Sequence, residues 1–393
     1  MLDNIQCTGC GACVNICPVN AIEMKKDIYG FKNPYITEDK CIHCGKCNRV
    51  CPSIERKNGI ADIEKQKAYI AVSKDPVVRH TSSSGGAFTE ICRSFGTEDL
   101  IVFGATFSMK GVEHTYIKSF DQITLLRKSK YIQSDMKNMY QQAEEFLKQG
   151  KRVVFTGTPC QIAGLRNYCG RDYENLLCID LICHGVGSWD VFRECINYME
   201  KEYKSKIIKY SFRTKKKYRG GVSERHTSEH LTEDGKRRLI EKDRYSQLFL
   251  EQLCIRQSCG EKCLYRTRDR QGDITISDFK NHKEVMKPSK YIRKDYSTVI
   301  ANNAKGIHAM ANLSQYMEMI PISIEDVLLD NPIFADSGMD NKQQSAFWED
   351  WKKLGAENTI SKWTHESKLT LKEKIIRLIP VQIFVLYYKL RNR

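Results

Sequence analysis

The stretch CTGCGACVNICP at residues 7–18 returns as CIHCGKCNRVCP at residues 41–52. In each copy, three cysteines separated by two residues are followed by a fourth cysteine and then directly by a proline. The eight cysteines are Cys7, Cys10, Cys13, Cys17, Cys41, Cys44, Cys47 and Cys51. Such tight, doubled spacing predicts a pair of ligand loops with short helices and brief strands within residues 1–55.

This spacing is typical of bacterial two-cluster ferredoxins, where three close thiolates bind one 4Fe–4S cluster and the cysteine before proline reaches the other cluster. It predicts one cluster on Cys7, Cys10, Cys13 and Cys51, and a second on Cys41, Cys44, Cys47 and Cys17. A zinc site has four ligands and does not need this doubled three-plus-one arrangement, and disulfides need an oxidising compartment. The segment therefore predicts electron transfer.

Length and composition limit the protein class. A chain of 393 residues suggests two or three domains, and 41% hydrophobic residues are enough for a real core. No basic segment followed by an apolar one precedes Cys7, so we expect a cytoplasmic protein. In that reducing compartment, 17 cysteines indicate metal ligands rather than disulfides.

The net charge of +15 is spread unevenly. Residues 200–245 hold fifteen Lys and Arg against eight Asp and Glu, and residues 364–393 hold seven against two. No nucleic-acid-binding motif accompanies the basic run at 213–219, so we expect no nucleic-acid partner. An acidic or phosphorylated substrate or partner is the use that this charge favours.

The pattern of apolar runs divides the rest of the chain. Strand-like runs near 68–72, 100–107, 152–155 and 176–182 alternate with helical patterns and predict an α/β body with a mixed sheet. Polar residues 55–66 indicate a linker. We expect four parts: an α+β ferredoxin-like module at 1–55, body domains at 66–150 and 151–329, and a basic helical tail at 330–393.

Two strand-to-helix turns contain residues suited to anions, Ser82–Gly86 and Thr156–Gln161. Glycines permit close backbone approach, hydroxyls donate hydrogen bonds, and a helix N-terminus offers unpaired N–H groups. Taken alone, each turn is more often an ordinary helix start, and Pro159 fits that explanation equally well.

Several segments, in order along residues 1–285, together resemble the coenzyme F420 hydrogenase/dehydrogenase beta-subunit family. They are residues 82–88, 129–134, 155–166 (FTGTPCQIAGLR), 180–188 (DLICHGVGS), 254–265 and 272–279 (GDITISDF). The chain is most similar to the bacterial branch with an N-terminal two-cluster ferredoxin module, often encoded among surface-polysaccharide genes. The resemblance implies an FAD enzyme whose two turns hold the flavin through Ser83, Ser84, Gly85, Gly86, Thr156, Gly157, Thr158 and Gln161.

The resemblance also implies a third 4Fe–4S cluster on Cys254, Cys259 and Cys263, although three residues separate the last two cysteines where that branch has two. Either Cys160 or Cys183 could supply the fourth ligand, and we assign Cys183.

Cys160 would then be a candidate reactive thiol beside the flavin, because a helix N-terminus stabilises a thiolate; a plain buried cysteine is the alternative. His184 is a candidate proton donor, with a structural hydrogen-bonding role equally compatible with its position.

The tail at residues 375–390 is apolar but is interrupted by Arg377, Pro380 and Gln382, and is too short to span a bilayer. Residues 374–393 could lie at the membrane surface, or could pack as a helix on the body or in a dimer.

We therefore expect a cytoplasmic iron–sulfur flavoprotein oxidoreductase, with peripheral membrane contact as an open alternative. It would pass electrons from a ferredoxin or other redox protein through 4Fe–4S clusters to FAD and then to a small anionic substrate, within surface-polysaccharide biosynthesis. One alternative is an electron-transfer subunit of a deazaflavin- or ferredoxin-linked complex with no substrate of its own. Another is a membrane-associated scaffold without redox activity.

Overall fold

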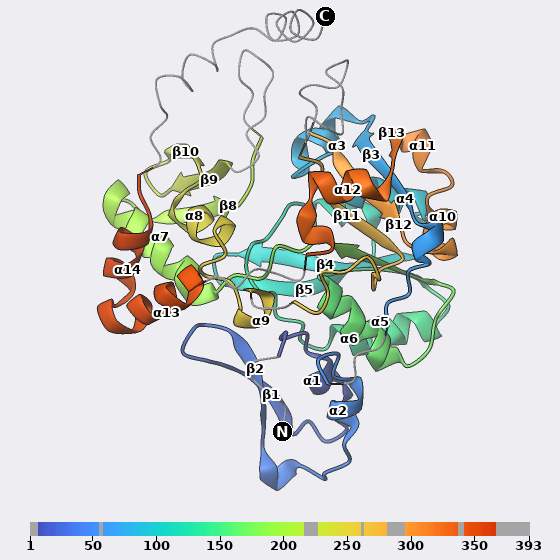
Figure 1. The fold of residues 1–393 in the computed structure, drawn as a ribbon, viewed down its shortest axis with the longest axis horizontal. Helices are drawn as coiled ribbons and strands as arrows, with labels where there is room; N and C mark the ends of the chain where they lie inside the picture. The colour runs from blue at the N-terminus through green and yellow to red at the C-terminus, as the bar shows by residue number, and fades with distance from the viewer. Residues whose placement is uncertain are drawn as a thin grey trace, which may run out of the picture.

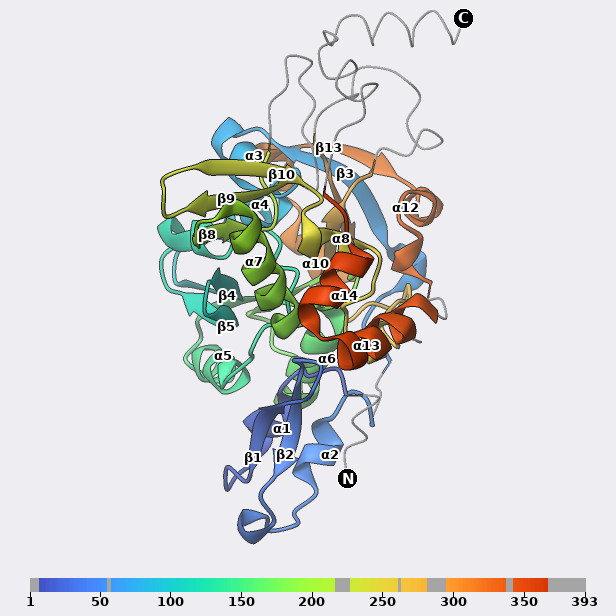
Figure 2. The same ribbon diagram turned by 90° about the vertical axis from the view of Figure 1, so that its left-hand side faces the viewer.

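The computed structural model describes residues 7–54, 58–215, 227–260, 263–280, 295–336 and 342–366. A large body surrounds an eight-stranded sheet, and the N-terminal module, coloured blue, lies at one end of the molecule (Figure 1). Turning the molecule by 90° leaves the module at that end, next to α6 (Pro159–Cys169) and α13 (Lys342–Leu354) (Figure 2). No described helix is long and apolar enough to cross a membrane.

The N-terminal module repeats in structure what the cysteine pattern repeats in sequence. Helices α1 (Ala12–Ile16) and α2 (Lys46–Val50) each begin after a glycine with positive φ, 78° at Gly11 and 70° at Gly45. Glycine suits both positions because other residues rarely adopt this left-handed conformation. Strands β1 (Ile22–Lys26) and β2 (Lys32–Ile36) form an antiparallel hairpin near the predicted strand positions, and the 3₁₀ turn η1 (Glu38–Lys40) follows.

The body contains a mixed sheet, as the sequence predicted. Its strand order is β13-β3-β12-β11-β7-β6-β4-β5. Neighbours β4, β6, β7 and β11 pair in parallel, and antiparallel strands flank them on both sides. The strands are β3 (Lys67–Ser73), β4 (Leu100–Ser108), β5 (Gly111–Ile117), β6 (Arg152–Thr156), β7 (Leu176–Leu181), β11 (Ile274–Asp278), β12 (Ser297–Ala301) and β13 (Met317–Ile322).

Strands from the two expected body domains share this sheet. β3 lies between β12 and β13, and β4 lies next to β6. A division at residue 150 therefore falls inside one sheet. The expected linker also packs on the body, because the backbone N–H of Ile60 donates to Arg270 O at 2.8 Å and that of Asp62 to Asn302 O at 2.8 Å.

Helices cover both faces of the sheet, because alternate residues of each strand point to opposite sides. Ile101 and Phe103 of β4 pack in the cluster formed with α5 and α6, whereas Val102 packs in the cluster formed with α4, α10 and α11. The body helices are α3 (Pro76–Thr81), α4 (Ala87–Ser94), α5 (Met139–Lys148), α6, α10 (Ala304–Ala309), α11 (Leu313–Tyr316) and α12 (Ile324–Asp330). The 3₁₀ turns are η2 (Ile63–Lys65), η3 (Phe120–Leu125) and η4 (Pro332–Phe334).

A third hydrophobic cluster joins strand β8 of a small three-stranded sheet to α7, α8 and the C-terminal helices. The elements of this part of the molecule are α7 (Trp189–Tyr203), β8 (Ile207–Ser211), β9 (Thr227–Thr232), β10 (Arg237–Glu241), α8 (Arg244–Leu250), α9 (Gln257–Gly260), α13 and α14 (Ala356–Trp363). Phe347 of α13 and Ile360 of α14 are fully buried there. The described part of residues 330–393 therefore packs on the body. The segment expected to contact a membrane, 374–393, lies outside the described residues.

Candidate functional site

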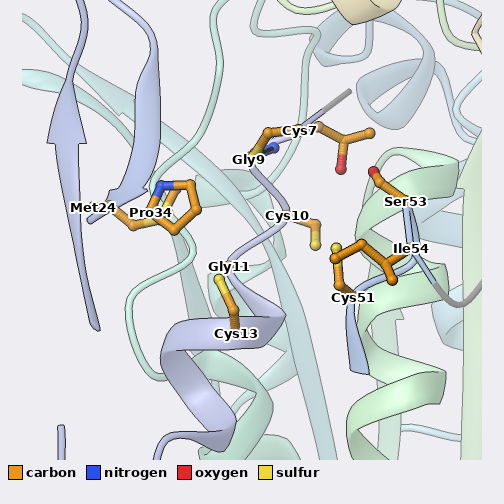
Figure 3. Close-up of a pocket in the computed structure, with 11 residues that line it drawn as sticks. Cys7, Gly9, Cys10, Gly11, Cys13, Met24, Pro34, Cys51, Ser53 and Ile54 are labelled. Carbon is orange, nitrogen blue, oxygen red and sulfur yellow. Dashed lines mark hydrogen bonds between the residues drawn. The ribbon is translucent and has the colours of Figure 1, made fainter. Parts of the chain in front are cut away.

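The first predicted ligand set is brought together. Cys7, Cys10, Cys13 and Cys51 line one pocket, although Cys51 is 38 residues beyond Cys13 (Figure 3). The cysteines come from the loop before α1, from α1 itself and from the end of α2. The backbone N–H of Gly9 donates to Cys7 Sγ at 3.3 Å, which is the kind of contact that stabilises a thiolate ligand.

The thiols of this set are electrostatic neighbours. Burial raises the pKa of Cys13 to about 12, and the nearby thiols of Cys7 and Cys51 raise it further. Burial is also the main cause that raises the pKa of Cys10, and the neighbouring thiols of Cys13, Cys7 and Cys51 raise this pKa further. Four thiolates confined together need a positive centre, because only metal binding makes their deprotonation favourable. The donor chemistry therefore fits an iron–sulfur cluster.

The second predicted set lies on the outer side of the module. Cys44 is exposed, and the side chains of Cys17, Cys41 and Cys47 are partly buried. The N–H of Ala21 donates to Cys17 Sγ at 3.2 Å, and Cys47 is close enough to Cys13 and Cys51 to affect their pKa values. Within the described ranges, no three possible ligands converge on a point that would already hold a metal ion. Neighbouring thiols therefore identify the first set, and the second set stays a prediction from its spacing.

The first set is fixed against helix α6 of the body. The hydroxyl of Tyr140 lies 2.8 Å from Cys10 O and 2.8 Å from Gln161 O, and this side chain is fully buried. A methyl group added at Gly164 would lie 3.1 Å from Cys10 Sγ and 3.1 Å from the Tyr140 hydroxyl. Helix α6 can approach the first set this closely because residue 164 has no side chain.

A further group of four cysteines lies in the body, at the N-terminal end of α6. Burial raises the pKa of Cys183 to about 12, and the thiols of Cys259 and Cys263 raise it further. Burial also raises the pKa of Cys259 to about 12, with Cys263 and Cys160 as its neighbours. Cys160 in turn has Cys183, Cys263 and Cys10 as neighbours. We call Cys160, Cys183, Cys259 and Cys263 the body cysteine group.

Cys254, expected in this group, lies elsewhere. It is fully buried in the hydrophobic cluster beneath α7 and α8, next to Tyr245 and Cys195. Its carbonyl accepts from the N–H of Ser188 at 2.9 Å, because this strand segment pairs with residues 186–188. The structure therefore brings together three of the four expected ligands and places Cys160, the other residue considered for the fourth position, beside them.

A buried arginine accompanies the body cysteine group. Arg266 is 7% exposed, donates from Nη2 to His184 O at 3.0 Å, and lowers the pKa of Cys183. Its buried Nε has no hydrogen-bond partner among the described residues. An anionic cluster held by four thiolates would supply the negative charge that this guanidinium needs. The surroundings therefore fit a third 4Fe–4S cluster.

The expected flavin turn at Thr156–Gln161 begins directly beside this group. Thr158 and Gln161 form a capping box at the start of α6, and Thr158 Oγ1 lies 3.1 Å from Cys160 Sγ. The side chain of His114 bridges Ser134 Oγ at 2.9 Å and Thr156 O at 3.0 Å. The turn thus contacts one member of the cysteine group.

In the other expected flavin turn, Ser82–Gly86, several polar groups are already hydrogen-bonded to other parts of the protein. Ser84 Oγ donates to Tyr296 O at 2.5 Å, and Gly85 N–H donates to Ser297 Oγ at 3.0 Å. A methyl group at Gly85 would lie 2.3 Å from Ala71 O, so packing against β3 and β12 already requires glycine there. Gly86 has a φ of 91° at the start of α4.

Residues 129–134 connect the two turns. Ser83 Oγ accepts from the N–H of Ser129 at 2.8 Å, and Ser134 Oγ accepts from Gln161 Nε2 at 2.9 Å. Between these ends, Lys130 Nζ donates to Leu126 O and Arg127 O. Burial, with a contribution from Lys128, lowers the pKa of Lys130 to about 7.

A stack of aromatic rings leads from this segment to the body cysteine group. The rings of Tyr131 and Phe249 are stacked at 4.5 Å, and the ring of His184, next to Cys183, lies 5.2 Å from Phe249. His184 Nε2 is 3.2 Å from Phe249 O, and burial followed by Arg266 lowers its pKa to about 4. His184 is therefore neutral at pH 7, which does not favour the proton-donor hypothesis.

The structure also disfavours a reactive thiol at Cys160. Burial is the main cause that raises its pKa, and the neighbouring thiols add to it. A reactive cysteine requires a lowered pKa. A ligand role fits the same surroundings, because metal binding drives deprotonation.

Sequence reasoning missed two residues that organise the site, Tyr140 and Arg256. In the sequence, Tyr140 occupies what looks like an ordinary apolar position of a helix. The two carbonyl groups that accept from its hydroxyl belong to segments far away in the sequence. Arg256 lies between Cys254 and Cys259, yet it hydrogen-bonds to the N-terminal module. No local pattern distinguishes either residue.

Comparisons with known proteins agree with the cysteine pattern. Residues 150–325 match the family model for the C terminus of the coenzyme F420 hydrogenase/dehydrogenase beta subunit. Residues 6–54 and 33–80 match two models of 4Fe–4S dicluster domains. No curated protein matched the chain.

Among solved structures, a chain of the F420-reducing NiFe hydrogenase complex from Methanosarcina barkeri is similar at 15% identity, with a TM-score of 0.43. The match covers 75% of this chain and 94% of that one. Taken with the two cysteine runs, the family models show that residues 150–325 belong to the coenzyme F420 hydrogenase/dehydrogenase beta-subunit family and that an N-terminal domain for two 4Fe–4S clusters precedes them.

Proposed function

We propose that this protein is an iron–sulfur flavoprotein oxidoreductase. Electrons from a redox-protein partner would enter through the two N-terminal clusters, pass a third cluster on Cys160, Cys183, Cys259 and Cys263, and reach FAD. The final acceptor would be a small, anionic organic molecule. The role in surface-polysaccharide biosynthesis stays a prediction from the resemblance.

The observation that carries this proposal is the position of the body cysteine group. It neighbours Cys10 of the first set, and Cys160 contacts Thr158 of a predicted flavin turn at 3.1 Å. Cysteine ligands thus form a continuous series from the outer side of the module to that turn. A series of one-electron centres is useful only when each neighbours the next, and the neighbouring thiols of Cys47 and Cys13, and of Cys10 and Cys160, support such a series.

The residues around the turns would serve FAD in separate ways. Bound flavin supplies both one- and two-electron chemistry, which links cluster electrons to an organic substrate. The start of α6 offers a helix N-terminus for an anion such as a phosphate, and glycine at residue 157 avoids a side chain that would crowd Gln161 and His114. Lys130, with a pKa of about 7, could both hold and release a proton at neutral pH.

Basic residues near the segment 129–134 support an anionic substrate. Burial is the main cause that lowers the pKa of Lys128. The nearby positive charges of Lys209 and Arg237, both in the small sheet, lower this pKa further, and the negative charge of Glu229 raises it. Arg213 and Lys215 donate to backbone carbonyls of the turn at 82–86. Arg213, Lys215 and Arg237 pair with Asp278, Asp295 and Glu229, so Lys128 and Lys209 supply the positive charge that an anionic substrate would use.

The test is flavin analysis of anaerobically purified protein. We expect one flavin per chain. We expect Gly157→Val to lose the flavin while keeping its iron, because the added side chain would displace Gln161 and His114 from the turn. Gly157→Ala should have a smaller effect. A wild-type protein that contains iron but neither retains flavin nor binds added FAD would contradict the proposal.

One observation favours the alternative of an electron-transfer subunit without its own substrate. The hydroxyl of Ser84 and the N–H of Gly85 are hydrogen-bonded within the protein, so the turn at 82–86 is stable without a ligand. If flavin is absent while iron is complete, this alternative replaces the oxidoreductase.

A further inference from the structure

Arg256 lies at the contact between the N-terminal module and the body, and is only 4% exposed. Its Nε donates to Cys7 O at 2.6 Å, and its Nη1 donates to Lys32 O at 3.2 Å and to Gln133 Oε1 at 3.1 Å. Its Nη2 donates to Asn33 Oδ1. Every acceptor is a neutral oxygen, and no carboxylate in the described part of the chain pairs with this guanidinium.

Two other buried arginines, Arg270 and Arg213, have acidic partners, whereas Arg266 lies beside the body cysteine group. Arg270, 2% exposed, pairs with Asp180 at 3.0 Å, and Arg213, 5% exposed, pairs with Asp278. This is expected, because a buried charge is strongly unfavourable unless an opposite charge accompanies it. Arg256 therefore needs a negative charge that the amino acids around it do not supply.

The neighbouring groups show where that charge would come from. Arg256 holds the backbone of Cys7, a ligand of the first set, and the hydroxyl of Ser258 supports the same carbonyl at 3.0 Å. On the other side, the N–H of Cys259 donates to Arg256 O at 2.9 Å, and the guanidinium lowers the pKa of the Cys259 thiol. The guanidinium is thus next to ligand residues of two different cysteine sets.

We propose that Arg256 is a positioning residue that acts as the shared counter-charge of two iron–sulfur clusters, one on the first set and one on the body cysteine group, and thereby raises the reduction potential of both. A cluster bound by four thiolates is anionic and gains negative charge on reduction, so a nearby fixed cation favours the reduced form. The effect on the body group depends on the proposed third cluster. The effect on the Cys7 cluster depends only on the N-terminal module.

The experiment is an anaerobic redox titration of the holo-protein, followed by electron paramagnetic resonance. In Arg256→Gln, we expect the equilibrium constant for reduction of the adjacent clusters to fall at least tenfold, which is about 59 mV for one electron. Arg256→Lys, which keeps the charge, should stay within about threefold of wild type. The cluster on Cys17, Cys41, Cys44 and Cys47 should not move, and it serves as the internal control.

Gln133→Glu separates charge from shape. This variant keeps an oxygen acceptor for Arg256 Nη1 and so keeps the contact, but it adds a competing carboxylate. We expect it to lower the same potentials as Arg256→Gln. Ser258→Ala removes a neutral hydrogen bond to the same Cys7 carbonyl and should leave the potentials unchanged. Arg193→Met, at a side chain that is 58% exposed, controls for loss of one remote charge.

If Arg256→Gln does not assemble, Gln133→Glu alone decides the matter. Wild-type potentials in Gln133→Glu, with full iron content, would overturn the proposal and leave Arg256 as a mechanical link between module and body. Iron content is measured separately. A wild-type protein with about eight irons would remove the third cluster, and the shift of the Cys7 cluster would then be the remaining test.

Discussion

At the residue scale, the site combines ligands with buried polar side chains that fix their surroundings. Tyr140 connects Cys10 O to Gln161 O, and His114 connects Ser134 to Thr156 O. Burial makes these bonds important, because an unsatisfied buried polar group costs about 1–3 kcal/mol. The cysteines alone do not explain how the turns and the ligand loops keep their relative positions.

His114 predicts a pH dependence of stability. Burial lowers its pKa to about 4, from 6.5 as the ordinary value. The unfolded chain therefore binds a proton between pH 6.5 and pH 4 that the folded chain does not bind. Stability from this residue is fully present above pH 6.5 and is lost as pH falls toward 4, by roughly 3 kcal/mol from the linkage relation.

The measurement is thermal unfolding under anaerobic conditions between pH 7 and pH 4.5, for the wild type and for His114→Gln. Gln keeps hydrogen-bonding groups but does not titrate, so the stability of the variant should fall less steeply with acid. Equal slopes for the two proteins would show that His114 is not the responsible group.

At the element scale, helix α6 holds the site together. Its N-terminus contains the capping box and Cys160, its middle contacts the first set at Gly164, and Arg166 near its end pairs with Asp273 at 3.1 Å. One helix thus touches the module, the body cysteine group and the expected flavin turn. A change in its position should affect all three.

Gly164→Val tests this role. Its side chain would meet Cys10 Sγ and the Tyr140 hydroxyl, and overpacking of this kind typically costs about 1–3 kcal/mol. We expect lower thermal stability and slower electron passage from the module clusters to the body, seen by stopped-flow absorbance. Gly164→Ala is the matched control: its methyl group needs only small shifts, and helix propensity favours it by about 1 kcal/mol. A valine variant with wild-type stability and kinetics would show that the contact is not tight.

Sequence patterns predicted some elements well and others not at all. The eight module cysteines could be assigned because ligand spacing in such loops is local. Apolar runs likewise located β3, β4, β6 and β7. The body cysteine group could not be resolved, because Cys160, Cys183 and Cys259 lie on three separate elements and meet only in the folded chain. The resemblance implied Cys254 as a ligand, but the segment that contains Cys254 pairs with residues 186–188 and places its side chain in the core.

At the scale of the whole molecule, the cysteine sets run from the exposed end of the module into the body. The outer set, with exposed Cys44, is the accessible one, and the first set lies against α6. Residues 40–54 contain Lys40, Lys46 and Arg49 and no acidic residue, and Ile42 is 60% exposed between two ligands. An acidic electron-carrier protein would fit such a surface.

Charge reversal at Lys46 and Arg49 should therefore slow reduction by an acidic ferredoxin. At low ionic strength, we expect a decrease on the order of tenfold that diminishes as salt is added, because surface electrostatics are screened. The double variant Lys206→Glu, Lys236→Glu reverses two exposed charges outside the module and serves as the control. Equal slowing in both double variants would mean that net charge, and not this surface, governs the encounter.

In the proposed function, electrons cross the body through a cluster held by Cys160, Cys183, Cys259 and Cys263. Iron and zinc analysis of anaerobically purified protein tests it most directly. We predict about twelve irons per chain in the wild type and in Cys254→Ala, and about eight in Cys160→Ala or Cys259→Ala, from the composition of such clusters. About eight irons in the wild type, zinc in place of iron, or a loss of iron in Cys254→Ala with none in Cys160→Ala would contradict the claim.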